Sequence, residues 1–331
     1  MRRCRRLSRT IVGLGLGSVF LVVALSCGGP SGGGGTAVDT QGFTSSGGYD
    51  SPTFLVFSQE YNTDPEIGKW LRTKDFRVAL SLAIDRKAIN EIVYRGTGTP
   101  GNWLTKPSSE YHPGSEWVTL DAVRDVGRAN SLLDELGLVD SDGDGLRDRP
   151  DGTGPLVLSW EVGGGFGVAS LQADVVGRAY NTIADLIKTH WREIGIGLDW
   201  TEGRDTFQKM KENKLYIGIH STPYAPEPWR TSWFRLVPIS ASTHFAPEIG
   251  RFLETNGLEG MAPSGPDPAY QPLAPDDTYP ADSTGALRRM QELWQEGLAL
   301  PEGDAGRVEI AQELFKIASE EKYTFGLVAI E

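Results

Sequence analysis

The feature that most constrains the fold is residues 76–94, in which apolar side chains recur at spacings of three and four. This spacing gathers them on one face, so the segment predicts two consecutive helices packed by their apolar sides. Thr73 precedes the first helix and Asp85 the second, and both residue types cap helix N-termini. The positions expected to be buried are Phe76, Ala79, Leu80, Ala83, Ile84, Ile89, Ile92 and Val93.

Strand and helix patterns alternate through the rest of the chain. Short apolar runs at residues 54–57, 156–160, 196–200 and 215–219 predict strands, and helix-spaced stripes separate them. This alternation predicts an α/β fold with a mixed sheet. Residues 221–284 lack periodicity and are rich in proline, serine and aromatic residues. Long irregular segments are uncommon unless they are functional or disordered, and the aromatic content of this one favours function. A long irregular surface excursion is the alternative.

The N-terminal residues 1–26 predict an export signal. Arginines come first, an apolar run follows, and small residues precede Cys27. The run is shorter than the ~20 residues that span a bilayer comfortably. The residues around Cys27 resemble a bacterial lipobox, which implies that this cysteine carries a lipid and forms the mature N-terminus; an ordinary signal with an incidental cysteine is the alternative. Residues 27–52, rich in glycine and serine, predict a flexible tether before a globular region at 53–331.

Composition excludes several classes of function. Cys4 and Cys27 are the only cysteines, so a lipidated mature chain has no thiol for catalysis, disulfide formation or zinc binding. The formal net charge is -12, and five arginines of the signal offset a still more acidic remainder. An acidic chain argues against nucleic acid as a partner. The four histidines lack metal-ligand spacing and no G-x-S-x-G motif occurs, so we expect no enzyme and no required cofactor.

Residues 140–151 resemble a calcium-binding loop. Carboxylates stand at positions 1, 3, 5, 9 and 12, with glycine at position 6, although position 12 is aspartate rather than glutamate. The candidate calcium ligands are Asp140, Asp142, Asp144 and Asp148. An acidic turn before a strand is the alternative interpretation.

Three blocks in order resemble one known family. They are residues 76–100 (FRVALSLAIDRKAINEIVYRGTGTP), 128–161 (RANSLLDELGLVDSDGDGLRDRPDGTGPLVLSWE) and 183–200 (IADLIKTHWREIGIGLDW). Together they resemble solute-binding proteins of family 5, the dipeptide, oligopeptide and nickel receptors of ABC importers. The resemblance extends from about residue 53 to residue 331 and concerns mainly the second lobe of these receptors, with the N-terminal lobe missing.

This resemblance implies a fold and a function. The family fold has two α/β lobes that close over a ligand, so we expect one incomplete lobe of the periplasmic-binding-protein type II class. The implied function is an extracytoplasmic lipoprotein that binds peptides or similar small solutes and delivers them to a permease in the inner membrane. Its expected place is the cell envelope, periplasmic or on the outer face. An oligosaccharide receptor of the same family and a truncated surface lipoprotein without a ligand remain alternatives.

The resemblance also implies candidate ligand residues. Peptide-binding members hold the ligand's ammonium group with an aspartate in a loop of the second lobe. Here Pro223 stands at the aspartate position and His220 at a tryptophan position, which favours an uncharged or sugar-like ligand unless Glu227 substitutes. Aromatic side chains nearby offer flat faces for stacking, although core packing is the alternative for each tryptophan. The predicted ligand residues are Trp103, His220, Tyr224, Glu227, Trp229 and Trp233.

Overall fold

The computed structural model describes residues 51–102, 105–163, 170–221, 228–229, 236–261 and 285–330. All of them belong to the second of two compact units, Val38–Glu331. The strands are β1 Ser51–Phe57, β2 Thr99–Pro100, β3 Val157–Val162, β4 Gly197–Glu202, β5 Ile217–Ser221 and β6 Thr324–Ile330. The helices are α1 Pro65–Arg72, α2 Lys74–Ala83, α3 Arg86–Tyr94, α4 Ser115–Thr119, α5 Val126–Glu135, α6 Ser170–Arg192, α7 Thr206–Lys211, α9 Pro247–Glu254, α10 Ala286–Leu298 and α11 Ala305–Glu321.

The strands form two sheets. Four of them pair antiparallel in the order β2-β6-β1-β5, and β3 pairs parallel with β4. The parallel pair is joined by α6, because parallel strands need a long crossover connection whereas antiparallel strands do not. The predicted α/β class is therefore confirmed, and its parallel and antiparallel pairings are divided between two sheets.

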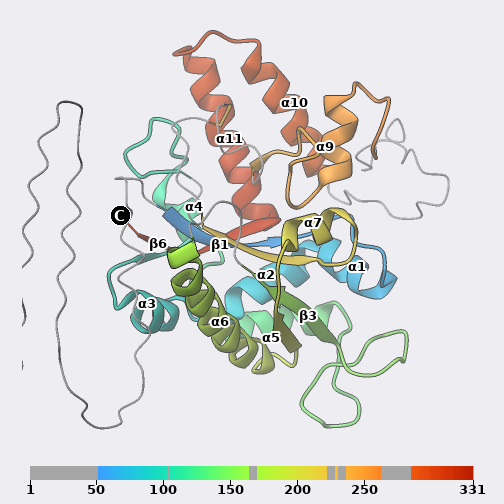
Figure 1. Cartoon of the computed structure of the whole chain (residues 1–331). Coiled ribbons are helices and arrows are strands. Elements are labelled where there is room, and N and C mark those ends of the chain that lie inside the picture. The colour runs from blue at the N-terminus through green and yellow to red at the C-terminus, as the bar shows by residue number, and fades with distance from the viewer. Residues whose placement is uncertain are drawn as a thin grey trace, which may run out of the picture. The chain divides into compact units, whose positions relative to one another are not determined.

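Strand β1 has two buried faces. Leu55 and Phe57 belong to a cluster that includes α2, α3, α5, α6, β3 and β4. Phe54 and Val56 belong to a second cluster with α7, α9, α10 and α11. Alternate side chains of a strand point to opposite faces, so β1 separates two helical layers. Figure 1 shows α10 and α11 on one side of the sheet and α2, α5 and α6 on the other.

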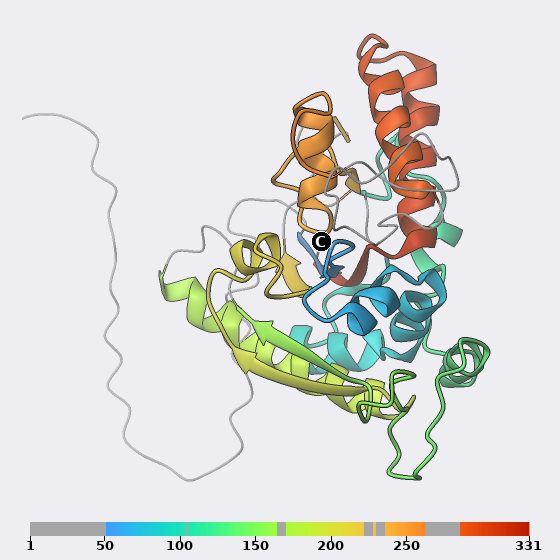
Figure 2. The ribbon, with the colours of Figure 1, turned by 90° about the vertical axis from the view of Figure 1, so that its right-hand side faces the viewer.

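The helices around this sheet differ in how far they extend from it. Figure 2 shows the α10–α11 hairpin projecting away from the sheet, while the β3–β4 pair lies against α6. Helix α6 is 23 residues long, yet its described part carries many charged and polar side chains. Among the helices in the described ranges, none combines the length and apolar content needed to cross a membrane.

Residues 76–94 form two helices as predicted, α2 and α3, and most of the expected apolar positions are buried. The carboxylate of Asp85 accepts a hydrogen bond from Ala88 N at 2.9 Å, which confirms its cap. Thr73 stands at the N-cap position of α2 as predicted, but its hydroxyl donates back to the Lys69 carbonyl of α1 at 2.9 Å and makes no capping bond to α2. Burial of Ile92 was wrong: its side chain is 52% exposed, since α3 presents Ile89 and Val93 to the core.

Helix α9 was not predicted and lies inside the segment interpreted as irregular. Its N-terminal amides, Glu248 N and Ile249 N, donate to the Glu60 carboxylate at 3.0 and 2.8 Å. Ala246 stands at the N-cap position without a side-chain acceptor, so Pro247 and Glu248 in the first turn are the local signals, and the cap comes from Glu60, far away in sequence. The start of α9 therefore depends on a tertiary contact.

Candidate functional site

The acidic loop that begins at Asp140 gathers three carboxylates. Oxygens of Asp140, Asp142 and Asp144 lie within 4.8 Å of one another on the surface. Backbone amides of the loop hold them: Gly143 N and Gly145 N donate to Asp140 at 2.7 and 2.9 Å. Both glycines have positive φ, 78° and 82°, which lets the chain fold tightly around the first carboxylate. This arrangement suits a hard cation such as calcium.

The fourth predicted calcium ligand, Asp148, is placed differently. Its carboxylate accepts hydrogen bonds from both the backbone N and the hydroxyl of Ser141, and these bonds hold its pKa below the usual range. Asp151, at position 12, is bound by Arg149 and Thr153. The structure therefore brings together three of the four predicted ligands and gives the fourth other hydrogen-bond donors.

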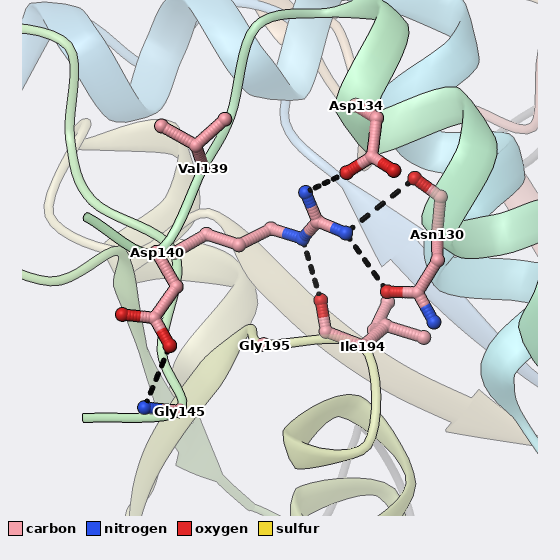
Figure 3. Close-up of a pocket in the computed structure, with 8 residues that line it drawn as sticks. Asn130, Asp134, Val139, Asp140, Gly145, Ile194 and Gly195 are labelled. Atoms are coloured by element: carbon pink, nitrogen blue, oxygen red, sulfur yellow. Dashed lines mark hydrogen bonds and ion pairs between the residues drawn. The ribbon is translucent and has the colours of Figure 1, made fainter. Parts of the chain in front are cut away.

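A pocket of about 310 Å³ adjoins this loop, lined by Asn130, Asp134, Val139, Asp140, Gly145, Arg147, Ile194 and Gly195 (Figure 3). The Arg147 guanidinium in its wall is already bonded in every donor direction. It donates to Ile194 O at 2.9 Å, to Asp134 at 2.6 Å and to Asn130 Oδ1 at 2.8 Å, and also to Leu138 O and Asn130 O. A guanidinium has five N–H donors, so none is left for a ligand. We interpret Arg147 as a structural residue whose hydrogen bonds hold α5, the acidic loop and the residues before β4 together.

His220 lies near the C-terminal end of β5, with only 9% of its surface exposed. Its imidazole stacks on the Phe54 ring at 5.7 Å and lies 5.0 Å from Phe207 and 5.3 Å from His244. Four rings from β1, β5, α7 and the segment before α9 therefore form one aromatic group.

Trp229 is anchored between α10 and α11. Its indole N–H donates to Trp294 O at 3.0 Å, and the Arg307 guanidinium lies 4.6 Å from its ring centre. Gly297 makes room for the ring, since a Cβ there would lie 2.0 Å from a Trp229 carbon. The side chain is 9% exposed, so packing uses most of its surface.

His220 and Trp229 border the same apolar cluster, through Phe54 and Phe207 for the histidine. The other predicted ligand residues and the lipidation site lie outside the described residues: Trp103, Tyr224, Glu227, Trp233 and Cys27.

Sequence analysis did not single out three buried cations at the junction of α2, α3 and β6. Arg86 donates to Gly326 O and Ser81 O, both at 2.8 Å, and burial lowers its pKa to about 9. Arg77 and Lys322 are also almost fully buried. Arg77 and Arg86 lie in the segment that carries the family resemblance, and their contacts indicate that this part of the pattern preserves the fold.

Comparison with known proteins identifies a family. A sequence model described as "Bacterial extracellular solute-binding proteins, family 5 Middle" matches residues 34–236, more than half of the chain. The periplasmic alpha-galactoside-binding protein of Rhizobium meliloti (strain 1021) is 37% identical over 84 residues, which cover 24% of this chain and 12% of that protein.

Solved structures show the same fold. The oligopeptide-binding protein OppA aligns with a TM-score of 0.66 and 23% identity, over 85% of this chain and 41% of that chain. MelB of Agrobacterium fabrum C58, in complex with stachyose, gives 0.57 and 15%, over 85% and 38%. AppA of Bacillus subtilis, in complex with a nonapeptide, gives 0.56 and 14%, over 85% and 46%.

These identities establish the fold alone, and that fold is the predicted type II periplasmic-binding-protein class. The chain spans less than half the length of each of these three structures and 12% of the alpha-galactoside-binding protein. The described sheets and helices therefore correspond to part of that fold.

Proposed function

This chain belongs to family 5 of the bacterial extracellular solute-binding proteins, and we propose that it binds peptides or similar small solutes for an ABC importer. The observation that carries the proposal is the family match over residues 34–236, which agrees with the fold likeness to OppA. Receptors of this kind work by burying a ligand and closing over it, so the function requires no catalysis. The partner that would receive the solute is a permease in the inner membrane.

The proposal includes attachment to a membrane surface. The basic start, apolar run and small residues before Cys27 support export and lipidation. The glycine-rich residues after Cys27 support a tether that lets the globular part reach its permease.

We place the ligand beside the C-terminal end of β5. His220 lies there with Phe54 and Phe207, and such rings present flat apolar faces that stack against a sugar ring or an aromatic side chain. The segment that follows, residues 222–227, contains Tyr224 and Glu227. The aromatic group therefore supports a site that recognises ligand shape and apolar surface.

An oligosaccharide is the second candidate ligand. Pro223 stands where peptide-binding members carry the aspartate that holds an ammonium group, so a peptide N-terminus would lack that partner. Two relatives also support it, because one is named an alpha-galactoside-binding protein and the other holds stachyose. A surface lipoprotein without a ligand is the remaining alternative.

Calorimetric titration with two panels tests the proposal. One panel holds short peptides, and the other holds raffinose and stachyose. We expect one panel to bind, and His220→Ala to weaken that binding ~10-fold by removing a stacking face. Trp200→Phe, on the separate β3–β4 pair, is the matched control and should leave affinity unchanged. Absence of binding in both panels would contradict the proposal and favour the surface lipoprotein.

A further inference from the structure

A small cavity separates the segment after β2 from helix α11. Asn102, His112 and Trp117 line it from the segment, and Ser319 lines it from α11. Three polar atoms of this lining, Asn102 Oδ1, His112 Nε2 and Ser319 Oγ, are buried and bond to no residue that the structure describes. Asn102 and Ser319 are each only 2% exposed. The free space between the lining atoms is too small to take a water molecule.

The hydrogen bonds around the cavity define the chemistry of these atoms. Gly114 N donates to His112 Nδ1 at 3.1 Å, so the neutral imidazole carries its proton on Nε2. Asn102 Nδ2 donates to Leu120 O at 2.5 Å, which leaves Oδ1 as the atom without a partner. The cavity is therefore lined by an N–H donor of His112, an acceptor oxygen of Asn102 and the hydroxyl of Ser319, and none of the three has a hydrogen-bond partner among the described residues. Buried polar atoms without hydrogen-bond partners lower the stability of the folded state, so three of them around one cavity are unusual in a native protein.

Among the described residues, polar contacts join the segment to α11 and to Lys322, which follows α11. Gln312 Nε2 donates to Glu110 O at 3.0 Å, and Lys322 Nζ donates to Leu120 O at 2.7 Å. Lys322 also donates to Ser319 O at 2.5 Å, and within the described ranges no carboxylate bonds to this fully buried ammonium. The interface therefore combines unpaired polar atoms with a desolvated charge, and both gain from contact with water.

We infer that residues 105–120 form a latch on α11, which opens as a unit in the native protein and opens further in acid. Opening would hydrate the three unpaired atoms and the Lys322 ammonium, and it would leave the pairing of β1 with β6 intact. Local opening of this kind is favoured where a closed interface keeps buried polar atoms without partners.

Acid should favour the open latch because protonation of His112 and Lys322 is less favourable in the closed latch than in the open one. A proton on His112 Nδ1 removes the acceptor for Gly114 N and places a charge beside the dry cavity. Burial already lowers the pKa of His112, against the attraction of Glu116. Burial lowers the pKa of Lys322 to about 7. The nearby cations Arg86, Lys74 and Arg128 lower this pKa further by repulsion, whereas attraction to Asp121 raises it. The open form thus binds protons more tightly, and lowering the pH shifts the population toward it.

Hydrogen exchange of the purified protein, followed by mass spectrometry, tests the latch. After correction for intrinsic rates, we expect amides of residues 105–119 to exchange at least ~10-fold faster at about pH 5.5 than at about pH 7.5, with β1 and β6 unchanged. Protection of this segment equal to that of β1 and β6 at both pH values would overturn the inference. An ordered water bridging the three atoms in a crystal structure would overturn it too.

Two variants separate the latch from general destabilisation. His112→Asn keeps an acceptor for Gly114 N and cannot titrate, so the acid effect on this segment should shrink to the part that Lys322 contributes. Ser319→Ala removes an unpaired hydroxyl, so exchange should slow at both pH values; unchanged or faster exchange contradicts the role of the cavity. His190→Asn is the control, because His190 is a buried histidine whose Nδ1 also accepts a backbone N–H, from Asp85, and whose pKa is also lowered by burial. If His190→Asn also loses the acid effect on the latch amides, that effect reflects general destabilisation of the protein and not opening of the latch.

Discussion

The Arg77 guanidinium binds both the backbone carbonyl and the carboxylate of Glu321. Its Nε donates to Glu321 O at 2.7 Å, and its Nη2 lies 3.3 Å from the Glu321 carboxylate. The two side chains are 1% and 6% exposed, so this ion pair is almost completely desolvated. It joins α2 to the end of α11 across most of the chain length.

Breaking this pair should destabilise the protein strongly. Arg77→Met leaves the Glu321 carboxylate buried, with Lys74 Nζ at 3.4 Å as its remaining cation. We expect the free energy of unfolding to fall by about 3 kcal/mol, as for other buried pairs that lose one partner. Urea unfolding at neutral pH measures it. Lys188→Met breaks an exposed pair with Asp199 and is the control, expected to cost less than about 1 kcal/mol. Equal losses in the two variants would show that burial of the pair is unimportant.

Lys322 should make stability depend on pH. Its pKa is about 7 in the folded protein, against an unfolded value near 10.4. Between these values the unfolded chain binds more protons, so the unfolding free energy should rise as the pH increases from about 7 to about 10. Lys322→Met, which fills a similar volume without a charge, should flatten that rise and stabilise the protein near pH 7.

The matched control for this pH dependence is Lys214→Met. Lys214 is exposed and pairs with Glu212, so its removal should leave the slope unchanged. Unfolding curves at several pH values measure all three proteins. If the unfolding free energy of Lys322→Met rises with pH as steeply as that of the wild type, the pH dependence comes from other groups.

The acidic loop should bind calcium weakly. Asp140, Asp142 and Asp144 are already gathered, whereas Asp148 is bonded to Ser141, so affinity near the millimolar range of extracellular sites is expected. Isothermal titration measures the binding, and Asp142→Asn should abolish it. Asp199→Asn, another exposed carboxylate, is the control. Absence of heat at millimolar calcium would identify the loop as a turn only.

Lipidation should depend on one of the two cysteines. Wild-type protein expressed in bacteria should fractionate with membranes and incorporate labelled palmitate. Cys27→Ser should lose the label and enter the soluble fraction, because the lipobox resemblance assigns the lipid to Cys27. Cys4→Ser is the control and should behave as wild type. A label that persists in Cys27→Ser would contradict the proposed anchor.

Local patterns predicted most elements. The apolar spacing of residues 76–94 predicted α2 and α3, and Asp85 caps α3 as its position indicated. Helix α9 could not be predicted in this way, because its N-terminal amides are capped by Glu60. Of the predicted ligand residues, His220 and Trp229 lie in the described part of the chain, and the indole of Trp229 proved to be an anchor between two helices.

Helix and strand periodicity determined the α/β class from the sequence alone, and the resemblance of three sequence blocks indicated the family, because both are properties of neighbouring residues. Tertiary structure decided which polar groups are buried together. Arg77 and Glu321, or Asn102, His112 and Ser319, meet only when segments distant in sequence are packed. Their ionisation and hydrogen bonding depend on exclusion from water, and desolvation is a property of the packed fold.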